Sequence, residues 1–140
     1  MNNLLQKTIL KSLSFKGIGL HSGKNSNIKI IPAENNKGIV FKRIDLPKDN
    51  IIEANFKNVS SAKLCTTLKN NFGNSVSTVE HLLAAFYIVG IDNAIVEVDN
   101  KEVPIMDGSS KDFVEKMSEV GLKNLTAKRK FLKIVKKIEY

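Results

Sequence analysis

Cysteine and arginine are both scarce in this chain. Its single cysteine, Cys65, cannot form a disulfide within the chain and is typical of a protein from a reducing compartment. Of the 22 basic residues only Arg43 and Arg129 are arginines, and arginine is the side chain that recognises guanine with a bidentate fork. The composition therefore argues against a protein that reads nucleic-acid bases.

Long apolar runs and a leader peptide are also missing. The longest apolar stretch, residues 82–91, contains a glycine and is roughly half as long as a membrane-spanning helix requires. The first seven residues lack the basic start, apolar middle and small-residue cleavage site of a signal peptide. We therefore expect a cytoplasmic protein without a transmembrane segment.

What is present is a composition typical of one globular domain. The chain has 140 residues, of which 42% are hydrophobic and 26% charged, so it can bury a core of ordinary size. Its formal net charge of +8 is compatible with nucleic acid, an anionic membrane or a phosphorylated ligand. A lysine-rich composition without any functional cause explains the charge equally well.

The pattern of apolar residues predicts an α+β fold. Strands are expected at residues 8–15, 27–31, 38–44, 51–56, 63–69 and 94–99, and helices at 78–89 and 111–120. Residues 130–140 resemble a further strand whose pairing partner is missing. This order favours two layers, with a mostly antiparallel sheet and two helices packed on one of its faces.

The helix expected at residues 78–89 is unusual in two respects. Ser77 and Glu80 have the spacing of a capping box, in which each side chain bonds to the other residue's backbone, and Gly90 is a typical stop. The helix is apolar on all sides, so a two-layer domain would cover only part of it. We expect something else to cover the rest.

Glu80 and His81 are the residues in which catalytic chemistry is most plausible. Glu80 is either the third residue of the capping box or a general base, and His81 is either a core histidine or a metal ligand. Neighbouring helical side chains point about 100° apart, so this pair can border one cavity but cannot chelate one ion side by side. A catalytic zinc needs about three protein ligands, and no His-Glu-x-x-His or paired-cysteine motif supplies them.

The other motifs have ordinary interpretations. The glycine-rich residues 17–24 match neither a Walker A nor a dinucleotide-binding motif, and are typical of a flexible turn. Cys65 is typical of a small buried residue. The lysine-rich tail is typical of a solvated strand edge.

Five short motifs nevertheless occur together in an order that resembles a known enzyme family. They are Gly-Ile-Gly-Leu-His-Ser-Gly at 17–23, Leu-Cys-Thr at 64–66, Ser-Thr-Val-Glu-His-Leu at 77–82, Gly-Ile-Asp-Asn at 90–93 and Pro-Ile-Met-Asp-Gly-Ser at 104–109. In this order they resemble UDP-3-O-acyl-N-acetylglucosamine deacetylase, the zinc enzyme that commits Gram-negative bacteria to lipid A synthesis.

The resemblance implies a particular architecture. Members of that family have two similar α+β domains whose helical layers face each other, with the active site between them. Residues 1–127 would form the first domain, and residues 128–140 would be the first strand of a second domain that is otherwise absent. The chain would then be a fragment or half of a split protein.

The resemblance also implies roles for five residues. His81 would be a zinc ligand, and Glu80 would be the general base that activates water for attack on the N-acetyl carbonyl. Leu20, Leu64 and Cys65 match positions near the metal and the substrate.

The remaining parts of the implied zinc site are expected in the second domain. These are a His-Lys-x-x-x-Asp motif and a catalytic histidine; His21 is not implied as a ligand. With one ligand, the chain alone is expected to be inactive and to bind Zn²⁺ weakly.

The expected partners are the UDP-linked acyl amino sugar and a second domain, in cis or in trans. Peripheral proximity to a membrane is compatible with the charge, and no nucleic acid is expected. The alternative is a non-catalytic basic module that binds an anionic partner such as RNA.

Overall fold

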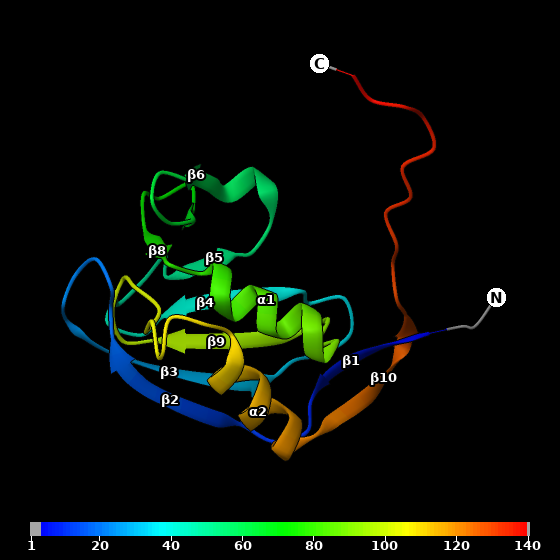
Figure 1. The fold of residues 1–140 in the computed structure, drawn as a ribbon, viewed down its shortest axis with the longest axis horizontal. Helices are drawn as coiled ribbons and strands as arrows, with labels where there is room; N and C mark the ends of the chain where they lie inside the picture. The colour runs from blue at the N-terminus through cyan, green and yellow to red at the C-terminus, as the bar shows by residue number, and fades with distance from the viewer. Residues whose placement is uncertain (1–3, 140) are drawn as a thin grey trace.

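A five-stranded sheet forms the centre of the computed structural model, which describes residues 4–139 (Figure 1). The strand order is β2-β3-β9-β4-β5, and neighbouring strands are antiparallel except for β4 and β9, which run parallel. The five strands are β2 (Leu13–Ile18), β3 (Asn25–Pro32), β4 (Ile39–Arg43), β5 (Ile51–Glu53) and β9 (Ala94–Val98).

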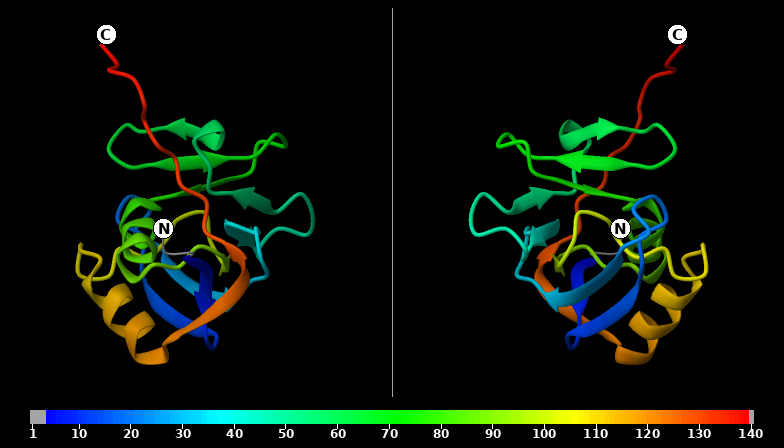
Figure 2. Two further views of the ribbon diagram at one scale, coloured as in Figure 1. Left: turned by 90° about the vertical axis from the view of Figure 1, so that its right-hand side faces the viewer. Right: turned by 90° about the vertical axis from the view of Figure 1, so that its left-hand side faces the viewer.

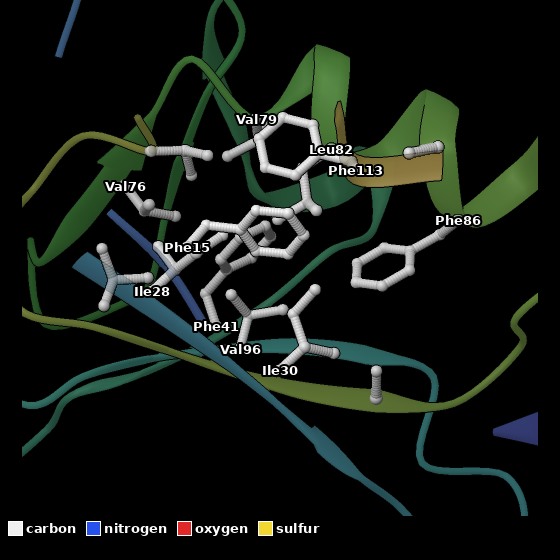
Figure 3. Packing of buried hydrophobic residues seen from close by; sticks show 14 of the residues in the cluster. Phe15, Ile28, Ile30, Phe41, Val76, Val79, Leu82, Phe86, Val96 and Phe113 are labelled. Atoms are coloured by element: carbon white, nitrogen blue, oxygen red, sulfur yellow. The ribbon is translucent and has the colours of Figure 1, made fainter. Parts of the chain in front are cut away.

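Alternating apolar residues determine which face of this sheet is buried. In β3, Ile28 and Ile30 are buried while Lys29 between them is exposed. They lie opposite Val98 and Val96 of β9 in the antiparallel register, so the four side chains share one face. Figure 3 shows this face packed against apolar side chains from the helices.

Two helices, α1 (Glu80–Val89) and α2 (Lys111–Val120), cover that face of the sheet (Figures 1 and 2). Leu82 and Phe86 of α1 and Phe113 of α2 join the buried cluster. Phe113 meets Phe15 of β2 edge-on, with ring centroids 4.8 Å apart. The predicted α+β class, with helices on one face of a mostly antiparallel sheet, is confirmed.

Both helices end where the sequence predicts. Gly90 follows α1 in the left-handed conformation at φ 86°, which glycine adopts without steric cost, and its N–H donates to the carbonyl of Phe86. The bounds of α2 coincide with the predicted range 111–120. Within residues 4–139, neither helix has the length and apolar character needed to cross a lipid bilayer.

Two smaller sheets flank the central one, and sequence patterns revealed them poorly. One pairs the first and last strands, and the other is a three-stranded sheet, here called the β6–β8 sheet, which lies above α1 in both views of Figure 2. Their strands are β1 (Leu5–Ile9), β10 (Leu122–Lys128), β6 (Val59–Ser61), β7 (Thr67–Lys69) and β8 (Ser75–Ser77), with the short helix η1 (Phe56–Asn58) before β6. The strand predicted at 63–69 was therefore wrong for residues 63–66.

The C-terminal segment differs from expectation too. Residues 129–139 contain no regular secondary structure, so the strand predicted at 130–140 is not formed over the described part of that range; Tyr140 lies outside the described residues. A strand needs a neighbour to accept its backbone hydrogen bonds, and the segment runs away from the body (Figure 1). The division of the chain into domains at 127/128 stays a prediction.

The outward side of α1 is uncovered. Tyr87 is 89% exposed and Ile88 is also exposed, although the opposite side of the helix is buried in the core. The sheet and α2 thus cover part of this apolar helix, as expected for two layers.

The central packing leads to a stability prediction. Phe41 of β4 is 0% exposed, and Phe41→Ala should lower the free energy of unfolding by about 3–5 kcal/mol, because it removes a large side chain and leaves a cavity. Phe56→Ala is the matched control, since Phe56 is 82% exposed. Urea unfolding measures both variants; equal losses would contradict the assigned core.

Candidate active site

The first turn of α1 begins at a sharp change of backbone direction. Ser77 is the last residue of β8, and Thr78 takes the left-handed conformation at φ 57°, which is uncommon for a β-branched residue. Val79 then occupies the N-cap position, and its apolar side chain makes no capping hydrogen bond. The predicted Ser77–Glu80 capping box is therefore wrong, because Ser77 is committed to a sheet and its hydroxyl donates to the carbonyl of Lys101.

Glu80 faces the loop before β7 instead of bonding back to Ser77. Its Oε2 accepts a hydrogen bond from the backbone N–H of Thr66 at 3.0 Å, and Oε1 makes no hydrogen bond within residues 4–139. The side chain is half-buried, with one oxygen fixed and the other available. This contact brings the motif at 64–66 beside the start of α1.

Leu64 and Cys65 precede that contact in the loop. Leu64 is almost fully exposed and has φ 64°, a left-handed conformation unusual for leucine. Cys65 is a half-buried free thiol, with Sγ 3.8 Å from Oγ1 of Thr67, so it is not the fully buried residue that its type suggests.

His81 is the second residue of α1 and is half-buried. Its backbone carbonyl accepts a hydrogen bond from the hydroxyl of Ser110 at 2.8 Å, which joins the start of α2 to the start of α1. The imidazole makes no hydrogen bond or ion pair within residues 4–139. Over the same residues, no three His, Cys, Asp or Glu side chains gather closely enough to hold a metal ion.

The glycine-rich motif forms a turn after β2 that carries Leu20 and His21, both exposed. A buried acid, Glu102, holds this turn. Its Oε1 accepts from the N–H of His21 at 2.9 Å, and its Oε2 accepts from the N–H of Ser22 at 2.8 Å. The hydroxyl of Thr78 donates to Oε1 at 2.9 Å, so the same carboxylate reaches the segment that leads into α1, two residues before Glu80.

Glu102 is only 2% exposed, yet it remains charged at neutral pH. Burial alone would raise the pKa of its carboxyl group, but hydrogen bonds from His21, Ser22 and Thr78 outweigh that effect and lower the pKa below its ordinary value. Glu102 belongs to none of the sequence motifs described above. The available signal was an acid directly before the apolar residues 103–106.

Close packing explains two glycines of the glycine-rich motif, Gly17 at the end of β2 and Gly19 in the turn. A Cβ at Gly19 would collide with the carboxylate of Glu102 and the hydroxyl of Ser22, and a Cβ at Gly17 would lie 2.9 Å from Cβ of Pro104. Ile105 also donates its N–H to the carbonyl of Ile18 at 3.0 Å. The motifs at 17–23 and 104–109, distant in sequence, therefore contact each other.

Four of the five motifs thus converge around the start of α1. Comparison with known proteins identifies the family in which the chain belongs. The model of the LpxC family, described as UDP-3-O-acyl N-acetylglycosamine deacetylase, matches residues 6–140. The chain belongs to this family. Its curated relatives carry the name UDP-3-O-acyl-N-acetylglucosamine deacetylase.

Three of these deacetylase relatives show the extent of the similarity. The chain is 49% identical over 132 residues to the protein of Geotalea uraniireducens, 45% over 135 residues to that of Shewanella frigidimarina, and 46% over 134 residues to that of Pseudoalteromonas atlantica. The matches cover 94%, 96% and 96% of this chain but 42%, 44% and 44% of the relatives. The chain therefore spans less than half the length of these deacetylases.

The fifth motif of this deacetylase-family chain lies at the other end of α1. The carboxylate of Asp92 accepts from the N–H of Lys7 at 2.8 Å and forms an ion pair with Arg129, whose Nε lies 2.8 Å from Oδ1. Arg129 also donates to the carbonyl of Gly90 at 2.8 Å, and its positive charge interacts favourably with the dipole at the C-terminal end of α1. This cluster fixes the residue after β10 to α1, away from Glu80 and His81.

The five residues expected in the site are thus only partly assembled. Glu80 and His81 share one helical turn, and the loop of Leu64 and Cys65 is bonded to that turn through Thr66. Leu20 is joined to it indirectly, through the turn that Glu102 holds beside Thr78.

Proposed function

We propose that this chain is the first domain of a zinc-dependent deacetylase that hydrolyses the N-acetyl amide of UDP-3-O-acyl-N-acetylglucosamine in the cytoplasm, the committed step of lipid A biosynthesis. The observation that carries the proposal is the position of Glu80 and His81 on one half-buried turn, in a chain of this family. Glu80 bonds to the adjacent loop and not back to Ser77, so its second oxygen is available to a substrate.

Among the described residues, His81 fits one ligand position of a zinc site. The imidazole of His81 has no competing partner within residues 4–139 and would supply one nitrogen ligand. No cluster of three ligating side chains exists in that range, so a site with three protein ligands would take at least one of them from outside it. When bound, zinc supplies Lewis acidity that polarises a carbonyl and makes water more acidic.

Glu80 is proposed to accept the proton that the attacking water loses. Its Oε2 is held by the N–H of Thr66, which restricts the carboxylate to one orientation, and Oε1 would take the proton. As the amide carbon–nitrogen bond breaks, the leaving amine must gain a proton, and the protonated Glu80 can return it. Leu20, Leu64 and Cys65 are proposed to contact the substrate from the two loops beside this turn.

A second domain is proposed to complete the site, in cis or in trans. The exposed side of α1 supports this, because Tyr87 borders an open pocket with Phe131 and Leu132, and these apolar surfaces would gain from being covered. The net charge of +8 suits a substrate with a diphosphate and a membrane with acidic headgroups nearby.

The proposal is tested in a completed protein, in which residues 1–140 replace the matching part of the Geotalea uraniireducens relative and the rest of that relative supplies the second domain. We expect it to release acetate from UDP-3-O-acyl-N-acetylglucosamine, and residues 1–140 alone to release none. The unaltered relative is the control for the assay. A completed protein that folds and binds zinc, but releases no acetate, would overturn the proposal.

A further inference from the structure

Glu102 lies at a junction of three segments, and its contacts suggest more than a contribution to folding. Its carboxylate accepts hydrogen bonds from the turn that carries Leu20 and from Thr78, two residues before Glu80. Its own backbone is paired with the end of β8, through a bridge to Ser77. One side chain therefore relates the turn after β2 to the start of α1.

The electrostatics make this junction specific for a carboxylate. A buried charge must be compensated, and no ion pair reaches Glu102 within residues 4–139. The compensation comes from two N–H groups and one hydroxyl, each of which needs an acceptor. An amide at this position would turn an N–H₂ group toward at least one of these donors, so glutamine cannot replace it without loss.

The hydrogen bond from Thr78 to Glu102 helps to set the direction in which α1 begins. A threonine at φ 57° is strained, and such a conformation persists only when its surroundings hold it. The hydrogen bond from its hydroxyl to Glu102 is one such restraint, and the direction of the first turn of α1 depends on it. Displacing Thr78 would move Glu80 relative to the loop of Thr66.

We propose that Glu102 is a positioning residue of the active site, which sets the Leu20 turn and the first turn of α1 in one fixed relation. We call the hydrogen bonds of Glu102 to His21, Ser22 and Thr78 the tether. Its role in catalysis rests on the proposed function, whereas the tether itself does not. Glu102 acts through Leu20 and Glu80 and has no contact of its own with the reacting groups.

Two variants separate the two arms of the tether. Glu102→Gln removes one of the two acceptor oxygens, each of which is bonded to the Leu20 turn, and Thr78→Val removes only the bond to the start of α1. Thr8→Val is the matched control, because Thr8 is equally buried and its hydroxyl donates to the carbonyl of Asn93, beyond the far end of α1.

The first measurement is amide hydrogen exchange of His21 and Ser22 in this chain, followed by NMR. Glu102→Gln should speed exchange at one or both of these amides by roughly tenfold or more, because glutamine keeps one acceptor oxygen and the two amides are bonded to different oxygens of Glu102. Thr78→Val and Thr8→Val should leave these two amides protected. Unchanged protection in Glu102→Gln, or the same increase in Thr8→Val, would overturn the tether whether or not the protein is a deacetylase.

The second measurement is the separation of kcat and KM in the completed protein. We expect Glu102→Gln to raise KM through the Leu20 turn, and Thr78→Val to lower kcat through Glu80 with KM nearly unchanged. A residue that served stability alone would lower the folded fraction and leave KM constant, as expected for Thr8→Val. Constant KM in Glu102→Gln, with an active unmodified protein, would contradict the positioning role and leave the proposed function standing.

Discussion

Replacing Glu80 by glutamine should reduce the rate of deacetylation by the completed protein about 10²- to 10⁴-fold, the usual contribution of a general base. Glutamine has nearly the same shape, and its amide oxygen can still accept the N–H of Thr66, so the loop and the helix keep their arrangement. What is lost is an oxygen able to take a proton at neutral pH. The measurement is kcat from acetate release, with thermal unfolding to check the fold.

The control for this variant is Glu115→Gln. Glu115 lies on the exposed side of α2, and within residues 4–139 it makes only a long, solvated ion pair with Lys111, so neutralising it should leave kcat unchanged. An ordinary kcat in Glu80→Gln would remove Glu80 from the mechanism. Loss of activity together with an unfolded Glu80→Gln protein would instead show that its contact with Thr66 serves the fold.

The parts of the fold that depend on local patterns were predictable. Alternating residues identified β3 and β9, and Gly90 marked the end of α1 because glycine accepts the left-handed backbone. Phe113 and Met117, four residues apart, lie on the buried side of α2, as helical spacing of apolar residues would place them. Each of these features is determined within a few residues of sequence.

The start of α1 shows where local reasoning fails. Ser77 and Glu80 have the spacing of a capping box, but Ser77 pairs with Thr67 in the β6–β8 sheet and bridges to Glu102. Those partners are distant in sequence, and their bonds replace the local cap. The same pattern of residues is therefore compatible with two structures, and tertiary contacts decide between them.

Glu102 escaped prediction for the same reason. Its donors His21 and Ser22 lie 81 and 80 residues away in the sequence, and no pattern around Glu102 predicts them as partners. The pairing of β1 with β10 is of this kind as well, since it joins strands that lie more than 100 residues apart in the chain, the first and the last of the described residues. The resemblance selected the right motifs, but only the structure reveals which side chain connects them.

Zinc content is expected to depend on one of the two histidines and not on the other. The completed protein should bind about one zinc ion per chain, and His81→Ala should lower this occupancy severely, because a catalytic site with three protein ligands would lose one of them. The backbone carbonyl of His81, which accepts from Ser110, is unaffected by the change, and its half-buried side chain leaves little cavity.

His21→Ala is the matched control for that measurement. The imidazole of His21 is exposed, and only its backbone N–H is bonded to Glu102, so the alanine variant should keep both the turn and the metal. Elemental analysis after dialysis against a weak chelator measures zinc per chain in each variant. Full zinc occupancy in His81→Ala, or equal loss in both variants, would contradict the role of His81 as a ligand. Removing a zinc ligand must lower the zinc content more than removing the control histidine.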